Sequence, residues 1–169
     1  MERIKKTITT YEVEHWRDGK LLSRTIDSNT CTAEGLNALL DIMFHASTQI
    51  TTWYVEIFES DTTPSDTTTY AVPVYTPSSA YDEATRPEYE EAAASSKVTT
   101  NSANKATFTI SDTKTIHGAA LVGGGSAATT KADVAGGGTL FSASKFSASK
   151  PVVDNDVLTV TISITVADT

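Results

Sequence analysis

The amino-acid sequence predicts a mainly β fold: an antiparallel β-sandwich or a jelly-roll-like barrel with one amphipathic helix at about residues 33–45. Three features indicate this class. Thr, Ser and Ala make up about two fifths of the chain, and Thr prefers strands to helices. Most apolar segments alternate with polar residues, and only one has a helical period. The length of 169 residues favours a single β-rich domain over residues 1–169.

A hairpin is predicted at the N-terminus, over about residues 1–27. Residues 4–16 are rich in Thr, Ile, Tyr and Val, which favour strands. Asp18-Gly19 follows, a pair that readily adopts the positive φ angles of a tight turn. Residues 21–26 then return as the second strand. We expect residues 1–16 to form an arm that contacts a partner.

A single helix is predicted from Ala33 to about His45. Thr32 suits the N-cap position, because its hydroxyl can accept a hydrogen bond from a free backbone N–H. Gly35 lowers helix stability, so the first turn is expected to fray. Apolar residues recur at the spacing of one helix face, which we expect to pack on the sheet: Leu36, Leu39, Leu40, Met43 and Phe44.

Further strands are predicted at residues 53–58, 107–111, 116–122, 140–146 and 158–166. Residues 53–58 carry large apolar groups on both faces, which is typical of a strand between two layers. Residues 158–166 alternate strictly between apolar and hydroxyl side chains, which is typical of a half-buried strand. The expected core comprises Leu36, Leu40, Phe44, Trp53, Val55, Ile57, Phe108, Ile110, Leu158, Val160, Ile162 and Ile164.

Long connections separate these elements, at residues 61–69, 76–96 and 123–138. The second carries two prolines and an acidic run, and the third is bounded by two Gly triplets. Loops of this length in a compact domain are usually functional or mobile. We therefore expect residues 61–105 and 123–138 to contribute contacts to a partner.

The charge balance excludes some classes of partner. Lys and Arg number 13 against 21 Asp and Glu, which gives a formal net charge of −8. Nucleic-acid binding through phosphates needs concentrated positive charge, so neither nucleic acid nor an anionic membrane is an expected partner. No apolar run approaches the length of a membrane span. The single cysteine, Cys31, excludes an intrachain disulfide, and no secretory signal is expected.

No combination of residues predicts a catalytic, cofactor or metal site. His15, His45 and His117 lie on different predicted elements, without the close spacing of metal-binding pairs. The Gly triplets lack the Lys and the following helix of a phosphate-binding loop. The acidic clusters at residues 82–91 and 154–156 are expected to be solvated surface, with Ca²⁺ binding or a catalytic carboxylate pair as alternatives. We predict a protein that is not an enzyme.

Taken in order, several segments resemble small virion structural proteins of tailed bacteriophages, and head decoration (cement) proteins match best. The resemblance covers most of the chain from about residue 30 onward and rests on the order of the segments. They are residues 32–41 (TAEGLNALLD), 52–58 (TWYVEIF), 81–89 (YDEATRPEY), 101–110 (NSANKATFTI), 116–122 (IHGAALV), 139–146 (TLFSASKF) and 156–162 (DVLTVTI). The resemblance implies no catalytic residues.

The resemblance implies a protein that binds the outside of the phage head and stabilises the shell. The expected partners are the major capsid protein, or portal or tail proteins, and further copies of the chain in a dimer or trimer. The expected location is the virion, assembled in the host cytoplasm. Eight residues are predicted to form interfaces: Ile4, Ile8, Tyr11, Tyr70, Tyr75, Tyr81, Arg86 and Tyr89.

Other functions are compatible with the same sequence. One alternative is a neck or tail component, such as a collar or fibre adaptor, present in few copies. Another is a module that binds host-surface glycans by stacking sugars on aromatic rings, for which the candidates are Trp53, Tyr54, Tyr70, Tyr75, Tyr81 and Tyr89. A small hydrolase that uses Glu88 and Glu90 is the least favoured.

Overall fold

A computed structural model of the chain describes residues 5–131, 134 and 137–168. It is mainly β and antiparallel, with one α-helix, as the sequence predicts. The elements are β1 (Lys5–Arg17), β2 (Lys20–Thr30), α1 (Ala33–Phe44), β3 (Trp53–Phe58), β4 (Val98–Thr100), β5 (Ala106–Thr109), β6 (Lys114–Gly123), a 3₁₀ turn (Ser126–Thr129), β7 (Thr139–Val152) and β8 (Val157–Asp168).

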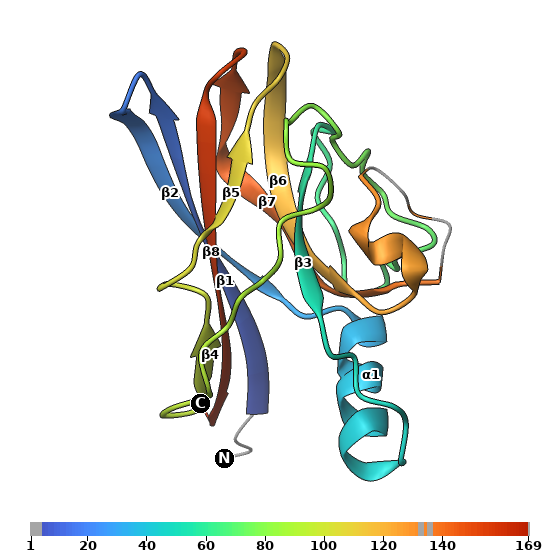
Figure 1. Cartoon of the computed structure of the whole chain (residues 1–169). Coiled ribbons are helices and arrows are strands. Elements are labelled where there is room, and N and C mark those ends of the chain that lie inside the picture. The colour runs from blue at the N-terminus through green and yellow to red at the C-terminus, as the bar shows by residue number, and fades with distance from the viewer. Residues whose placement is uncertain (1–4, 132–133, 135–136, 169) are drawn as a thin grey trace.

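Two antiparallel sheets form the body of the molecule (Figure 1). Sheet A has the order β2-β1-β8-β4, and β5 also pairs with β8. Sheet B has the order β3-β6-β7. The end of β2 joins the two sheets, because Cys31 forms a bridge with Ser142 of β7 and Asp27 accepts a hydrogen bond from the Ser147 N–H. The result is a β-sandwich with the core between the sheets.

Strand β1 is not an arm but an interior strand of sheet A. It pairs with β2 on one side and, from Lys5 to Trp16, with β8 on the other. The Asp18-Gly19 turn lies between β1 and β2, with φ of 50° and 71°. The expected hairpin therefore forms, and residues 5–16, expected to be an arm that contacts a partner, are paired within sheet A. One face of β1 carries hydroxyl and acidic residues, which are typical of a surface segment, whereas Tyr11 and Val13 on its other face are fully buried.

The core lies between the inner faces of the two sheets. Seven residues predicted to be in the core are buried there: Val55, Ile57, Phe108, Ile110, Leu158, Val160 and Ile162. Three others pack against this cluster while partly exposed: Leu36, Trp53 and Ile164. The prediction was wrong for Leu40 and Phe44 of α1, which are 53% and 81% exposed. The helix forms where it was expected, but most of its apolar face lies outside the core.

Sheet B is covered on its outer face as well, by residues 59–91. Tyr75 of this segment stacks on Phe58 of β3, and Tyr70 belongs to the same small cluster. The segment also forms isolated bridges to β3 at Glu88 and Pro77. Strand β3 therefore has two apolar faces because one packs in the main core and the other packs against the 59–91 segment.

Helix α1 is anchored at its first turn. The Thr32 hydroxyl accepts a hydrogen bond from the Gly35 N–H at 3.0 Å and so caps the helix. Gly35 is buried, and a Cβ on it would lie 2.5 Å from the Cα of Phe141 in β7. The glycine permits the backbones of α1 and β7 to come into contact. The first turn is thus the part of the helix that is held most closely.

Gly35→Ala is expected to lower the free energy of unfolding by about 1–2 kcal/mol, because the added methyl overlaps the backbone of β7. In a helix free of such contacts, Gly→Ala is stabilising by about 1 kcal/mol, so the sign of the change is diagnostic. Urea unfolding followed by circular dichroism measures it. Asn37→Ala, on an exposed position of the same helix, serves as the control. A stabilised Gly35→Ala variant contradicts the close packing.

Candidate functional site

Most residues predicted to form interfaces lie in the interior. Ile8 is partly buried, and Ile4 lies outside the described residues. The remaining six are buried within the chain itself, each at most 6% exposed: Tyr11, Tyr70, Tyr75, Tyr81, Arg86 and Tyr89. Residues 70–89 lack periodicity and resemble a loop in sequence, yet they turn their aromatic rings onto the sandwich.

Arg86 is the centre of the contacts that hold the 59–91 segment. Its guanidinium forms a buried ion pair with Glu56 of β3 and donates 3.0 Å hydrogen bonds to the Tyr70 hydroxyl and the Ala128 carbonyl. Burial raises the pKa of Glu56 to about 7, against the opposing effect of the nearby guanidinium. The contacts with Glu56 and Ala128 join the segment to β3 and to the 123–138 loop, and the contact with Tyr70 lies within the segment. The cluster is a structural anchor.

A second buried cluster surrounds Asp156, which was predicted to be solvated. Its carboxylate accepts hydrogen bonds from Arg17 Nε and from His15 Nε2, each at 2.7 Å, and from the Val153 N–H at 2.9 Å. Hydrogen bonds from Arg17 hold the pKa of this carboxyl far below its usual range. The cluster fastens the turn between β7 and β8 to the end of β1. Asp154, its neighbour in the turn, is exposed as expected.

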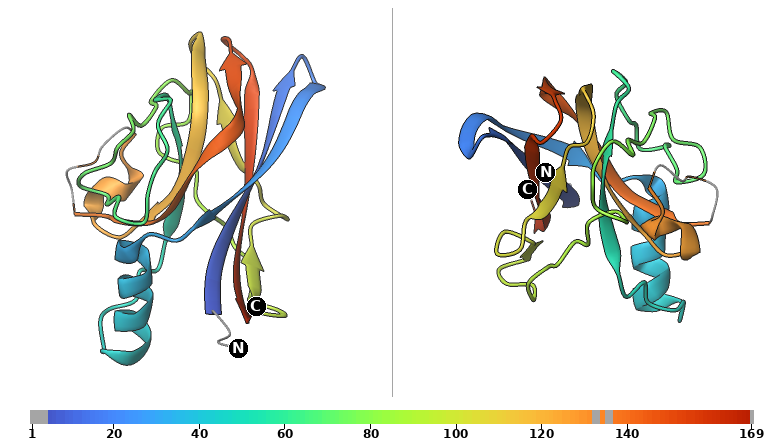
Figure 2. Two further views of the ribbon diagram at one scale, coloured as in Figure 1. Left: turned by 180° about the vertical axis from the view of Figure 1, so that it is seen from behind. Right: turned by 45° about the horizontal axis from the view of Figure 1, so that its top comes forward.

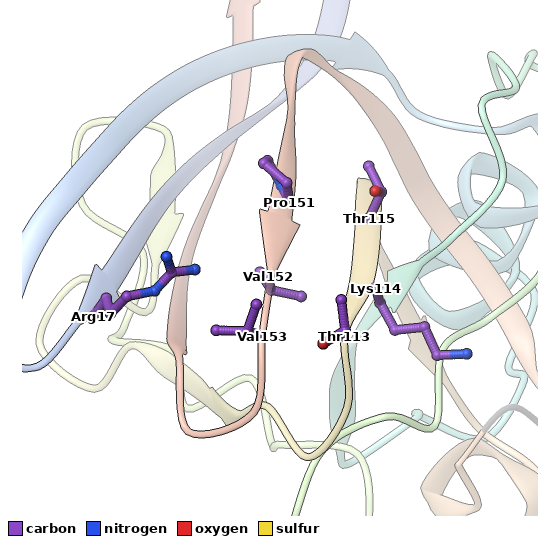
Figure 3. Close-up of a pocket in the computed structure, with 7 residues that line it drawn as sticks. All are labelled: Arg17, Thr113, Lys114, Thr115, Pro151, Val152 and Val153. Atoms are coloured by element: carbon purple, nitrogen blue, oxygen red, sulfur yellow. The ribbon is translucent and has the colours of Figure 1, made fainter.

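A shallow hollow near this turn carries two cationic side chains, Arg17 and Lys114 (Figure 3). Arg17 forms its ion pair with Asp156. Lys114 lies 3.6 Å from a carboxylate oxygen of Glu59 and 3.8 Å from one of Asp112. Both cations thus have carboxylate partners within the chain, so the hollow offers an incoming anion little uncompensated charge.

The remaining candidate residues do not converge. His15 belongs to the Asp156 cluster, and His117 lies 3.5 Å from Asp61. Burial raises the pKa of the Cys31 thiol, whose sulfur lies 3.3 Å from the Thr9 hydroxyl. Within the described ranges, no group of three or more His, Cys, Asp or Glu residues could hold a metal ion. None of the helices that the structure describes is long and apolar enough to cross a bilayer.

The most distinctive surface is an apolar groove beside α1. The helix extends past the end of sheet B and stands apart from the lower ends of β1, β8 and β4 (Figures 1 and 2). Side chains of the helix, the following loop and these strands line a groove of about 570 Å³ between them. Its floor contains Trp53 and Phe141, whose rings meet edge to face.

The apolar face of α1 divides into two parts. One part, with Leu39, Ile42 and Met43, lines the groove, and the other, with Leu40 and Phe44, lies beside it. Phe44 is 81% exposed and Met43 is 66% exposed. Large apolar side chains gathered on one surface of a monomer typically mark a site of interaction.

Comparisons with known proteins leave the chain's family open: no protein-family model matches it, and no curated protein matches it. Its function is therefore inferred from its own surfaces. The groove and the adjoining face of α1, which we call the α1 surface, form the candidate functional site. The apolar face of the helix is predicted by its periodicity, but the expectation that it packs in the core was wrong for Leu40 and Phe44, since periodicity shows that a face is apolar and not what covers it.

Proposed function

We propose that this chain is a structural protein of a tailed-bacteriophage virion: a decoration (cement) protein that binds the outside of the head and stabilises the shell. The observation that carries the proposal is the uncovered α1 surface, which indicates a protein that works within an assembly. The kind of assembly comes from the resemblance of seven consecutive segments to small phage virion proteins. The protein acts through contacts, without chemical conversion of a substrate.

The proposed mechanism is mass action. A protein that binds the assembled shell, and not its separated subunits, stabilises the shell by its binding free energy. Many copies on one particle add many modest contributions, and linked copies strengthen one another. The net charge of −8 favours contact with positively charged patches on the shell. The major capsid protein is the proposed partner on the head.

A neck or tail component is the second candidate. The uncovered α1 surface favours it equally, because a collar or an adaptor also works within an assembly. The two candidates differ in copy number. Glycan binding gains less support, because Phe44 is the one aromatic side chain that is largely exposed among the described residues, and a single ring is a poor stacking platform.

Reconstitution on heads tests the proposal. Phage heads are prepared from a strain whose gene for this chain is deleted, and the purified full chain is then added. We expect saturable binding in many copies per head by gel densitometry, together with a higher melting temperature of the head by calorimetry. Few copies confined to the neck or tail of intact particles favour the second candidate. Absence of the chain from purified particles overturns both.

A further inference from the structure

We propose that the α1 surface is covered by a second copy of this chain, in a dimer with two-fold symmetry. Leu40 and Phe44 of each copy enter the apolar groove of the other. The inference deepens the proposed function, on which it rests, by naming the first partner of the site. The observations that carry it are the shape, the charge and the size of the surface.

The shape of the surface is complementary to itself. A two-fold interface brings the same patch of both subunits together, so the patch must contain both a projection and a recess that accepts it. The recess is the groove of about 570 Å³, with Trp53, Leu121 and Phe141 in its floor. The projection is the adjoining flank of α1, where Phe44 is 81% exposed. The projection and one wall of the recess both belong to α1. One two-fold rotation can therefore place the projection of each copy in the recess of the other.

The charges of the surface are also complementary. The helix contains two charged residues, both acidic, Glu34 and Asp41. Glu34 accepts hydrogen bonds from the Tyr70 and Leu140 N–H groups, whereas the Asp41 side chain is exposed. Two charged residues outside the helix line the groove, Glu91 and Lys97. Among the described residues, neither Asp41 nor Lys97 has an ion-pair partner, so a helix that enters from a second copy brings Asp41 toward this lysine.

The size of the surface approaches that of an ordinary interface. Eighteen residues line the groove, of which fourteen are at least partly exposed, and Leu40 and Phe44 extend it. Interfaces of ordinary size use about 20–30 residues from each partner. The lining is dominated by apolar and aromatic groups, with charged residues at the margin, which is the usual arrangement of an interface core and its rim. A small ligand would cover the groove but leave Phe44 in water.

The mass of the full chain in solution tests the dimer. Sedimentation equilibrium over a wide range of concentrations is expected to show a monomer of 18.0 kDa in equilibrium with a species of twice that mass. Phe44→Asp is expected to weaken dimerisation at least about tenfold, because it places a charge in an apolar contact. Leu22→Asp is the matched control: Leu22 is 50% exposed on β2, far from α1 in sequence, and its replacement should leave the dimer unchanged.

A charge exchange identifies the partner as a second copy. Asp41→Lys and Lys97→Glu are each expected to weaken the dimer, and the double variant is expected to restore it, because both contacts then regain opposite charges. Urea unfolding of each variant shows that the fold is retained, since all the substituted side chains are exposed. A monomer at every concentration, a trimer, or a dimer that is indifferent to Phe44→Asp overturns the proposal.

The outcome is separable from that of the proposed function. A chain that stays monomeric yet binds heads in many copies overturns the dimer and leaves head decoration standing, with the α1 surface then assigned to the shell. A chain that dimerises through α1 but does not bind heads supports the dimer and contradicts the decoration function.

Discussion

Arg86→Met is expected to lower the free energy of unfolding by about 3–5 kcal/mol at about pH 8, because it leaves Glu56 buried without its counter-charge. Arg86 is 1% exposed and Glu56 is 3% exposed, so water does not replace the lost ion pair. The same substitution removes the hydrogen bonds to Tyr70, within the 59–91 segment, and to Ala128, in the 123–138 loop. Urea unfolding followed by tryptophan fluorescence measures the change.

The loss is expected to be smaller at about pH 5. Burial raises the pKa of Glu56 from 4.5 to about 7 in the folded protein. A group with a raised folded-state pKa contributes stability that is complete below the unfolded value and is lost as the pH rises through the folded value. Without Arg86 the pKa of Glu56 rises further. The free energy of unfolding of the variant therefore continues to fall above pH 7. In the wild type, the contribution of Glu56 to the free energy of unfolding levels off there.

The matched control for Arg86 is the exposed pair between Arg24 and Glu12, where Arg24 is 51% exposed. Arg24→Met is expected to cost about 0–1 kcal/mol, because water already screens the pair. Adding Glu56→Gln to Arg86→Met should remove the excess pH dependence, since no carboxyl then remains to titrate there. Equal losses for Arg86→Met at the two pH values would show that the ion pair does not govern the anchor.

Asp156→Asn is expected to lower the free energy of unfolding by about 3 kcal/mol at neutral pH, since it removes charge-assisted hydrogen bonds from a buried site. The carboxylate is 1% exposed and holds the Arg17 guanidinium and the His15 imidazole. An amide accepts through one oxygen only and presents an N–H group to these donors. The turn between β7 and β8 and the end of β1 are then held less tightly.

The effect of Asp156→Asn is expected to shrink in acid. Hydrogen bonds from Arg17 depress the pKa of Asp156 below its usual value of 3.8. A depressed folded-state pKa contributes stability that is present above the unfolded value and is lost as the pH falls through the folded value. The urea midpoints of wild type and variant should therefore approach each other at about pH 3. Asp154→Asn, in the same turn but exposed, is the control and should change stability by less than about 0.5 kcal/mol. A constant gap between the midpoints contradicts the linkage.

The parts of the fold that could be predicted are those with a regular period. Strand β8 alternates strictly, and its inward residues Leu158, Val160 and Ile162 are fully buried. Helix α1 begins after the cap at Thr32 and ends within one residue of the expected position. A regular spacing of apolar residues shows the type of element and that one of its faces is apolar. Both can be predicted because they depend only on residues that are close in the sequence.

The parts that could not be predicted depend on residues distant in the chain. Arg86 resembles a surface arginine in a polar loop until Glu56, Tyr70 and Ala128 surround it. Asp156 resembles a solvated turn residue until Arg17 and His15 reach it across more than 130 positions. Gly35 resembles a weak point of the helix until Phe141 packs against its Cα. Loop sequences carry no period that would show these partners.

Composition and short-range spacing encode the β class, the single α-helix with its apolar face, and the acidic charge, so all of these follow from the order of the amino acids. Tertiary packing alone establishes that β1 lies inside sheet A, that the tyrosines of residues 70–89 are interior, and that the outer half of α1 faces water. The difference arises because burial is a property of the whole packed molecule. The spacing of apolar residues shows that α1 has an apolar face, but only the packed molecule shows that the helix contacts β7 at Gly35 and leaves Phe44 exposed.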